Sequence, residues 1–396
     1  MARPFASRPL LLAAIQSACL FGCHSSTTGQ PGTSPPVIST DAAADSATTP
    51  VPEPTPTPTT DAETPRDAPP PVVDDAAAPP ADAPQIPPSD AAAALVAGLS
   101  PQRFRDNIAT VAGFGDRLQG TTKFDAASAW LDQTLTGLGY TVEHHHYTYL
   151  GGPRINTFVT KIGTKSPDRM YIVGAHLDGR GNGGGADDDG SGVSLVLEVA
   201  RAFAPATVTT DVSIRFAFWC NEETGMDGST AYVADRGPMQ GMESPPGSGK
   251  FPEPRWLGMI QHDMMLYDHG LPPGPVQRAG ADINIDYQAS AKMSAQAKQL
   301  AAQFADGAKT HAKDYPATVG DNMAGTDSTP FQDAVPAISM REARRVEEIL
   351  RGSNPNHHQP TDLPGSYSDL DYRLGFNALQ TTLGSIAALA GARVGP

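Results

Sequence analysis

The chain has 396 residues, a net charge of −15 and three cysteines. Residues 24–92 hold ten acidic side chains and one basic side chain, so this segment supplies most of the negative charge. The remainder is mildly acidic and has no basic patch, which argues against nucleic acid binding. Cys19 and Cys23 lie near the N-terminus and leave Cys220 as a single thiol, so we expect no disulfide within the folded part.

The N-terminus predicts an export signal that ends in a lipid attachment site. Two arginines precede an apolar run over residues 10–21, which is too short to span a membrane as a stable helix. The run ends in LFGC, which resembles a bacterial lipobox in which cleavage precedes Cys23 and lipid joins its thiol. An ordinary signal peptide is the alternative, and Phe21 is bulky for its place. We expect a signal peptide over residues 1–22 and an exported protein, lipid-anchored to the cell envelope.

Residues 23–92 are expected to comprise the lipidated cysteine and a disordered spacer. The spacer contains 17 of the 38 prolines and no aromatic residue. Such a composition buries too little apolar surface to offset the entropy lost on ordering. The prolines favour extended polyproline II, which makes the spacer stiffer than a Gly/Ser linker. The remaining residues, 93–396, are enough for one large globular domain.

Helices and strands alternate in the pattern predicted for this domain. Ser100-Pro101 predicts a helix start, because proline is favoured at the first helical position. In chain order we expect this helix, a helix over 122–139, strands over 140–149, 156–162 and 170–175, a helix over 191–203, strands over 212–220 and 256–262, a helix over 293–311, a strand over 337–340 and a helix over 369–390. The order predicts an α/β fold with a mixed, largely parallel central sheet flanked by helices on both faces.

Polar residues follow the first buried strands, and sites gather at strand ends in α/β proteins. His176 and Asp178 follow the strand over 170–175, and a carboxylate beside a histidine is typical of a metal ligand with its orienting partner. Three adjacent carboxylates at 187–189 lie between glycines, and a dication would offset their mutual repulsion. Calcium is an alternative ion for such a loop, but the spacing does not fit an EF-hand and His176 favours zinc.

Later strand ends carry further candidates. Glu222 and Glu223 follow the strand over 212–220, and in such a pair one glutamate can bind metal while the other takes a proton from water. Asp263 follows the next strand, and His358 lies in a loop before the last helix. Each signal is weak alone, because solvated acidic turns are common. Their repetition at successive strand ends predicts a metal centre.

These motifs, in this order and spacing, resemble the zinc aminopeptidases of peptidase family M28 over about residues 170–380. The resemblance rests on five motifs: AHLD at 175–178, GADDDGSG at 185–192, NEETG at 221–225, TDSTPF at 326–331 and HQPTD at 358–362.

The resemblance implies two zinc ions in one site. His176 and Asp263 would hold one ion, Glu223 and His358 would hold the other, and Asp188 would bridge both, with a cis peptide to Asp189. Three carboxylates and two neutral imidazoles then balance most of the charge of two dications.

The resemblance also implies the chemistry. Glu222 would be the general base that takes a proton from a zinc-activated water, and Asp178 would orient His176. The substrates would be peptides that lose their N-terminal residues. Two positions depart from the family: His357 stands where a tyrosine often precedes the last ligand, and Ser328 where a histidine often follows the aspartate. Neither departure removes a ligand.

Other functions stay open. A glutaminyl cyclase shares the fold but uses one zinc, and a carboxypeptidase or dipeptidase shares the fold with different substrates. A non-catalytic binding lipoprotein would be signalled by a lost ligand or base, and none is missing.

We expect structural rather than functional roles for three further sets of polar or thiol side chains. The histidines at 144–146 lie in a strand that splits them between two faces. Cys220 is interpreted as a packed thiol. Asp282, Asn284 and Asp286 are interpreted as the solvated face of a strand.

Overall fold

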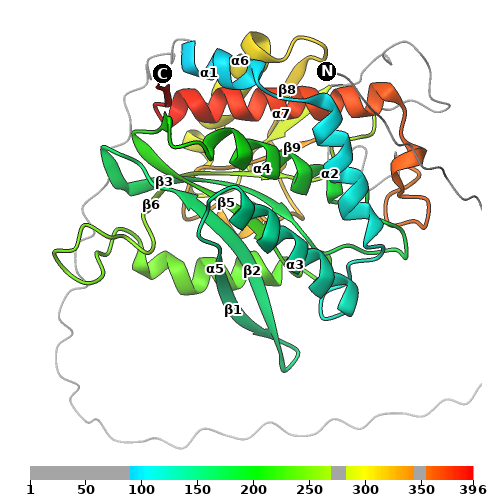
Figure 1. The fold of residues 1–396 in the computed structure, drawn as a ribbon, viewed down its shortest axis with the longest axis horizontal. Coiled ribbons are helices and arrows are strands. Elements are labelled where there is room, and N and C mark those ends of the chain that lie inside the picture. Colours follow the sequence, from blue (N-terminus) through cyan, green and yellow to red (C-terminus); the bar gives the residue numbers. More distant parts are fainter. Residues whose placement is uncertain (1–89, 269–281, 343–353, 396) are drawn as a thin grey trace, which may run out of the picture. The chain divides into compact units, whose positions relative to one another are not determined.

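An eight-stranded sheet forms the centre of the domain in the computed structural model, which describes residues 90–268, 282–342 and 354–395 (Figure 1). The strand order is β1-β2-β5-β3-β6-β9-β7-β8. The strands are β1 Glu143–Tyr149, β2 Gly152–Lys161, β3 Ser166–His176, β5 Val212–Trp219, β6 Arg255–His262, β7 Ile283–Asp286, β8 Ala317–Gly320 and β9 Ala337–Arg341. The four central strands β5, β3, β6 and β9 are mutually parallel. Antiparallel pairing joins β1 to β2, β2 to β5 and β7 to β9, so the predicted mixed, largely parallel sheet is confirmed.

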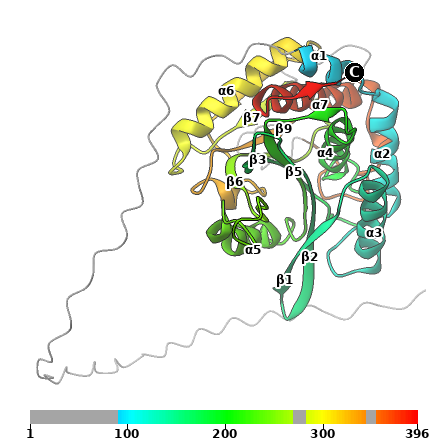
Figure 2. The ribbon, with the colours of Figure 1, turned by 60° about the vertical axis from the view of Figure 1, so that its left-hand side comes forward.

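Helices cover both faces of this sheet, as predicted. Figure 2 shows α5 on the face opposite to α4 and α7. Side chains alternate along β3, so Met170 and Ile172 join one apolar core while Val173 and Ala175 join the other. The helices are α1 Asp90–Ala97, α2 Pro101–Gly113, α3 Thr122–Gly137, α4 Gly190–Phe203, α5 Asp227–Arg236, α6 Ser294–His311 and α7 Asp369–Leu389.

Local signals explain where these helices begin. Ser100 caps α2 by accepting a hydrogen bond from the Arg103 amide, at 3.2 Å, and proline follows it as expected. Ser368 forms a reciprocal capping box with Asp371 at the start of α7. Among the described residues, no helix combines the length and the apolar character needed to cross a bilayer.

Several elements differ from the prediction. The helix α5, the strand β8, and a two-stranded ribbon of β4 Val208–Thr209 and β10 Arg393–Val394 had no counterpart in it, whereas β7 was expected only as the strand that carries Asp282, Asn284 and Asp286. The helix α1 begins at Asp90, so residues 90–92 are helical rather than part of the expected spacer; they are alanine-rich, and Ala92 is fully buried. The expected signal peptide, Cys23 and the rest of the spacer lie outside the described residues.

The structural interpretations of the remaining polar groups have mixed outcomes. Cys220 is fully buried and unpaired, as predicted. The strand β1 buries His145 and leaves His146 exposed on its other face. The solvated face assigned to β7 is wrong, because Asn284 and Asp286 are only 2% and 3% exposed. The strand β9 places Arg341 opposite Asn284 and Ser339 opposite Asp286, and these two residues are buried as well.

Candidate metal centre

Parallel strands bring the predicted site residues to one edge of the sheet. His176 is the last residue of β3, and Asp263 directly follows β6. Glu222 and Glu223 lie in the turn after β5, which pairs with β3 on its other side. Asp188 precedes α4, whose N-terminus points into the same region. Because the carboxyl ends of parallel strands meet at one edge, residues far apart in sequence converge there.

Asp188 lies at the centre of the cluster. Its Oδ1 is 3.2 Å from His176 Nε2, and its Oδ2 is 3.2 Å from His358 Nε2. On the first side, His176 Nε2 is 3.8 Å from Asp263 Oδ1. On the second side, His358 Nε2 is 2.8 Å from Glu223 Oε2. We call His176 and Asp263 the inner half, and Glu223 and His358 the outer half, of a cluster that shares Asp188.

Burial and neighbouring charges shift the pKa values of the residues in this cluster. Although burial alone would raise it, Arg341 and His176 lower the pKa of Asp263 to about 2. Burial and the nearby Asp188 raise the pKa of Glu223 to about 7. Burial opposes the charged form of His358, but the two carboxylates beside it raise its pKa to about 10. The cluster therefore concentrates negative charge that attracts cations, including the protons on its histidines.

The donor set fits metal ions. Among the described residues, the buried Nε2 atom of His176 lies near two carboxylates without forming a well-oriented hydrogen bond, and the buried Oε1 atom of Glu223 has no hydrogen-bond partner. A buried polar atom without a partner is costly, and a metal ion would remove that cost. Donor atoms about 3 Å apart also suit a tetrahedral ion with ligands at about 2.0–2.2 Å. Nitrogen and carboxylate donors together favour zinc over calcium or magnesium.

Comparison with known proteins agrees with this geometry. The model for "Peptidase family M28" matches residues 157–372, which is more than half of the chain. The chain belongs to peptidase family M28. Leupeptin-inactivating enzyme 1 of Streptomyces exfoliatus is 32% identical over 119 residues, 30% of this chain and 27% of that protein. A probable lipoprotein aminopeptidase, LpqL, of Mycobacterium tuberculosis is 43% identical over 70 residues, 18% of this chain and 14% of that protein.

Solved structures share the fold of this M28 family member. The LapA aminopeptidase of Legionella pneumophila matches with a TM-score of 0.57 and 18% identity over 76% of this chain and 74% of that one. A glutaminyl cyclase of Fimbriiglobus ruber matches with a TM-score of 0.54 and 16% identity over 74% of this chain and 96% of that one. At these identities the matches establish the fold alone, and the reaction has to be inferred from the residues of the site.

Asp178 contacts both halves of the M28 site. Its backbone carbonyl lies 3.1 Å from His176 Nδ1, closer than its carboxylate Oδ1, which lies 3.7 Å away. The carboxylate accepts the amide hydrogens of Glu222 and Glu223 at 3.2 and 3.3 Å. Asp178 thus fixes the glutamate turn as well as the imidazole, which is a wider role than the orientation of His176 alone.

Two more aspartates hold Asp188 in place, and the sequence interpretation gave neither of them this role. The Asp188–Asp189 peptide is cis, as the family resemblance implied. Asp189 caps α4 and accepts the His176 amide hydrogen at 3.1 Å. Asp362 accepts the amide hydrogens of Asp187 and Asp188 at 2.9 and 3.1 Å. The HQPTD motif contains Asp362, so this residue was recognised from sequence, but its role in holding Asp188 was not.

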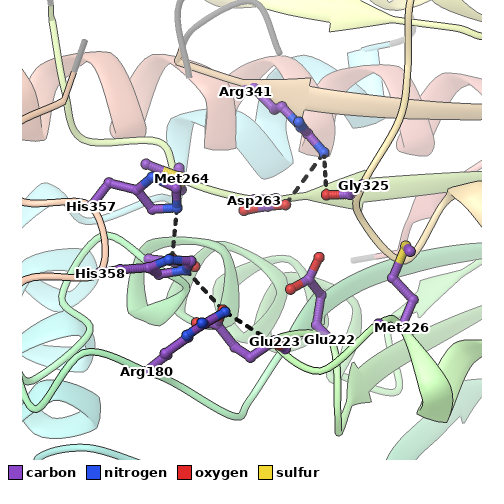
Figure 3. A pocket seen from close by; sticks show the side chains of 12 residues that line it. Arg180, Glu222, Glu223, Met226, Asp263, Met264, Gly325, Arg341, His357 and His358 are labelled. Atoms are coloured by element: carbon purple, nitrogen blue, oxygen red, sulfur yellow. Dashed lines mark hydrogen bonds and ion pairs between the residues drawn. The ribbon is translucent and has the colours of Figure 1, made fainter. Parts of the chain in front are cut away.

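A pocket opens over both halves (Figure 3). His357 lines it and places Nε2 at 3.5 Å from Asp188 Oδ2, with its ring 3.9 Å from the ring of His358. The residue that departs from the family pattern therefore faces the centre. Ser328, the other departure, is fully buried and does not line this pocket. Four lining side chains were not among the candidates from sequence: Arg180, Met226, Met264 and Arg341.

Proposed function

We propose that this M28 peptidase is a two-zinc aminopeptidase that removes N-terminal residues from peptides. The two-sided contact of Asp188 carries the proposal, because each of its oxygens faces a different histidine and so suits a bridge between two ions. His176 and Asp263 would hold one zinc, and Glu223 and His358 the other. When bound, the zinc ions would polarise the scissile carbonyl and acidify water.

Glu222 is placed to move the proton. It lines the pocket beside Asp263 and Glu223 (Figure 3). Burial raises its pKa well above the ordinary value; Asp263 adds to the rise, and His176 opposes it. A carboxylate with a raised pKa can accept a proton from water and return it to the leaving amine. We assign Glu222 as the general base, while Asp178 holds its backbone in position.

A panel of aminoacyl chromogenic substrates beside N-blocked copies tests the reaction. An aminopeptidase turns over the free substrates and loses that turnover when the amine is blocked. Turnover of blocked substrates would instead support an endopeptidase, and a carboxypeptidase would turn over neither set, because it needs a free C-terminal carboxylate. A glutamine substrate in the same panel detects a cyclase, which would release ammonia and leave the chromogenic bond intact.

The number of ions has its own test. Purified protein should contain close to two zinc ions per chain by elemental analysis, and a chelator should abolish turnover. One zinc per chain at full activity would contradict the two-zinc assignment, and calcium would contradict the zinc assignment.

We also propose that residues 1–22 direct export and that lipid on Cys23 anchors the protein to the cell envelope. The named relative LpqL is described as a lipoprotein aminopeptidase, which supports this arrangement. His24 rather than aspartate follows the cysteine, so we expect the outer membrane in a bacterium with two membranes. The variant Cys23→Ser should move from the membrane fraction to the soluble fraction. Unchanged membrane association of the variant would refute the lipid anchor.

A further inference from the structure

A guanidinium reaches the pocket from the end of β9. Arg341 is the last residue of that strand and is only 1% exposed, yet it lines the pocket. Its Nε donates to Ser339 Oγ at 3.0 Å, and its Nη2 donates to the carbonyl oxygens of Ala324 and Gly325 at 3.3 Å each. These contacts fix the side chain toward the centre, where Nη2 lies 3.4 Å from Asp263 Oδ2 (Figure 3).

The partners of Arg341 leave its charge poorly compensated once metal is bound. Three of the contacts named above are to neutral oxygens. The fourth, Asp263, would share its negative charge with the inner zinc. A buried cation is costly unless an anion faces it. An anionic group arriving from the pocket would supply that partner.

The net charge of the pocket lining also favours an anionic substrate group. Four carboxylates and two guanidiniums line it. Two zinc ions would add four positive charges, and the lining would then carry an excess of two positive charges, histidines aside. Arg180 lies on the opposite wall and donates to the Glu223 carbonyl at 3.4 Å (Figure 3). A cationic side chain would be repelled by this positive excess, and a neutral one would leave Arg341 without a further anionic partner.

We propose that Arg341 is a specificity-determining residue that receives a carboxylate of the substrate. The inference rests on the proposed peptidase function and deepens it by naming the substrate class. The carboxylate has two sources with the same chemistry: the side chain of an acidic residue at the cut, or the free C-terminus of a dipeptide. Arginine suits either source, since its planar fork can bind both oxygens at once.

Matched substrate pairs separate the two sources. Glutamyl and glutaminyl p-nitroanilides differ in a side-chain charge, and Ala-Ala and Ala-Ala-amide differ in a terminal charge. The carboxylate member of one pair should have a kcat/KM about 10- to 100-fold higher, because a charge-assisted hydrogen bond is worth about 1.5–3 kcal/mol. The pair that shows the preference identifies the source. Equal rates, or a preference for the amide in both pairs, would overturn the proposal.

Variants test whether Arg341 causes the preference. Arg341→Gln should bring the carboxylate-to-amide ratio close to one, and Arg341→Lys should retain part of it. Arg180→Gln, on the opposite wall, should preserve the ratio. If Arg341 only positions Asp263, Arg341→Gln lowers both members of each pair equally, and that result refutes the proposal. The ratio cancels any general loss of activity, and Arg341→Lys serves if the glutamine variant fails to fold.

A binding measurement keeps this inference apart from the proposed reaction. If neither these pairs nor leucine p-nitroanilide is turned over, the proposed function fails. Calorimetric titration of the zinc-loaded protein with glutamate and with glutamine still tests the carboxylate site. Glutamate should bind about tenfold or more tightly than glutamine, and Arg341→Gln should remove the difference. Equal affinities in the unmodified protein would refute the site.

Discussion

The inner and outer halves of the metal centre share Asp188 but are built from different parts of the fold. The inner half comes from strand ends: His176 closes β3, Asp263 follows β6, and their side chains are 1% and 10% exposed. The outer half comes from loops; the side chain of His358 is 32% exposed, while that of Glu223 is 3% exposed. Strands paired on both sides fix the inner donors, whereas turns hold the outer ones.

This difference predicts that the two halves bind their zinc ions with unequal affinity. Donors supported by packing and hydrogen bonds need little reorganisation to bind, so the inner half should hold zinc more tightly. The outer half depends on a loop in which His358 has a left-handed φ of 55°. Gly181 permits that loop to approach, because a Cβ there would lie 2.4 Å from the His358 carbonyl carbon. The outer zinc should therefore be the first to leave on dilution or chelation.

The largest expected effect comes from a residue that belongs to neither half. Glu222→Gln keeps the shape of the side chain but cannot accept a proton, so kcat should fall by about 10²- to 10⁴-fold. Both zinc ions should remain bound, and KM should change little. Steady-state kinetics together with elemental analysis checks this. Loss of a zinc ion in Glu222→Gln would show that Glu222 is a ligand rather than the base.

The same carboxylate-to-amide change in each half compares the halves directly. Glu223→Gln should weaken the outer zinc, and excess zinc should restore part of the activity. Asp263→Asn should lose the inner zinc and also remove the carboxylate that faces buried Arg341. We expect the metal-free Asp263→Asn protein to lose about 2 kcal/mol of stability.

The matched control for that stability loss is Glu223→Gln itself. Its partner His358 is partly exposed, so water can solvate the charge left behind and the stability of the metal-free protein should change by less than about 1 kcal/mol. Denaturant unfolding of both metal-free variants measures the contrast. Equal losses of stability, or zinc rescue of Asp263→Asn but not of Glu223→Gln, would contradict the ranking of the halves.

The sequence predicted the centre better than its surroundings for a physical reason. Long apolar strands such as β3 and β5 have a strong pattern, and the polar residues that end them converge in any parallel sheet. Short strands lack such a pattern: β8 has four residues, which explains its absence from the prediction, and β7, also of four residues, was recognised as a strand only by its alternating polar residues. The metal and base roles of the site residues stay predictions, although the fold brings them together.

Arg341 shows what strand-end patterns leave out. It directly follows a predicted strand like other site residues, but an arginine there is equally typical of a solvated strand end. Its orientation depends on carbonyl oxygens of Ala324 and Gly325 in a loop that no local pattern places. Residues whose role depends on contacts between distant loops are therefore the ones that sequence patterns miss.

The smallest expected contrast between the halves is in pH dependence. A zinc ion displaces the proton of one histidine in each half, because neighbouring carboxylates outweigh burial and raise the pKa of both His176 and His358. Asp263, with a pKa of about 2, adds no proton in the inner half near neutrality. Glu223, with a pKa of about 7, adds a second proton in the outer half below pH 7.

The sign follows from these shifts. A raised pKa favours the protonated ligand, so zinc affinity falls as pH decreases, by about tenfold per pH unit for each proton displaced. Between pH 7 and pH 5.5 the outer half should therefore lose affinity about tenfold per unit faster than the inner half. Zinc retained after dialysis across this range should drop from two ions to one before it drops to none. Simultaneous loss of both ions would show that the halves bind zinc with equal affinity, and the contrast between strand-held and loop-held ligands would then have no energetic consequence.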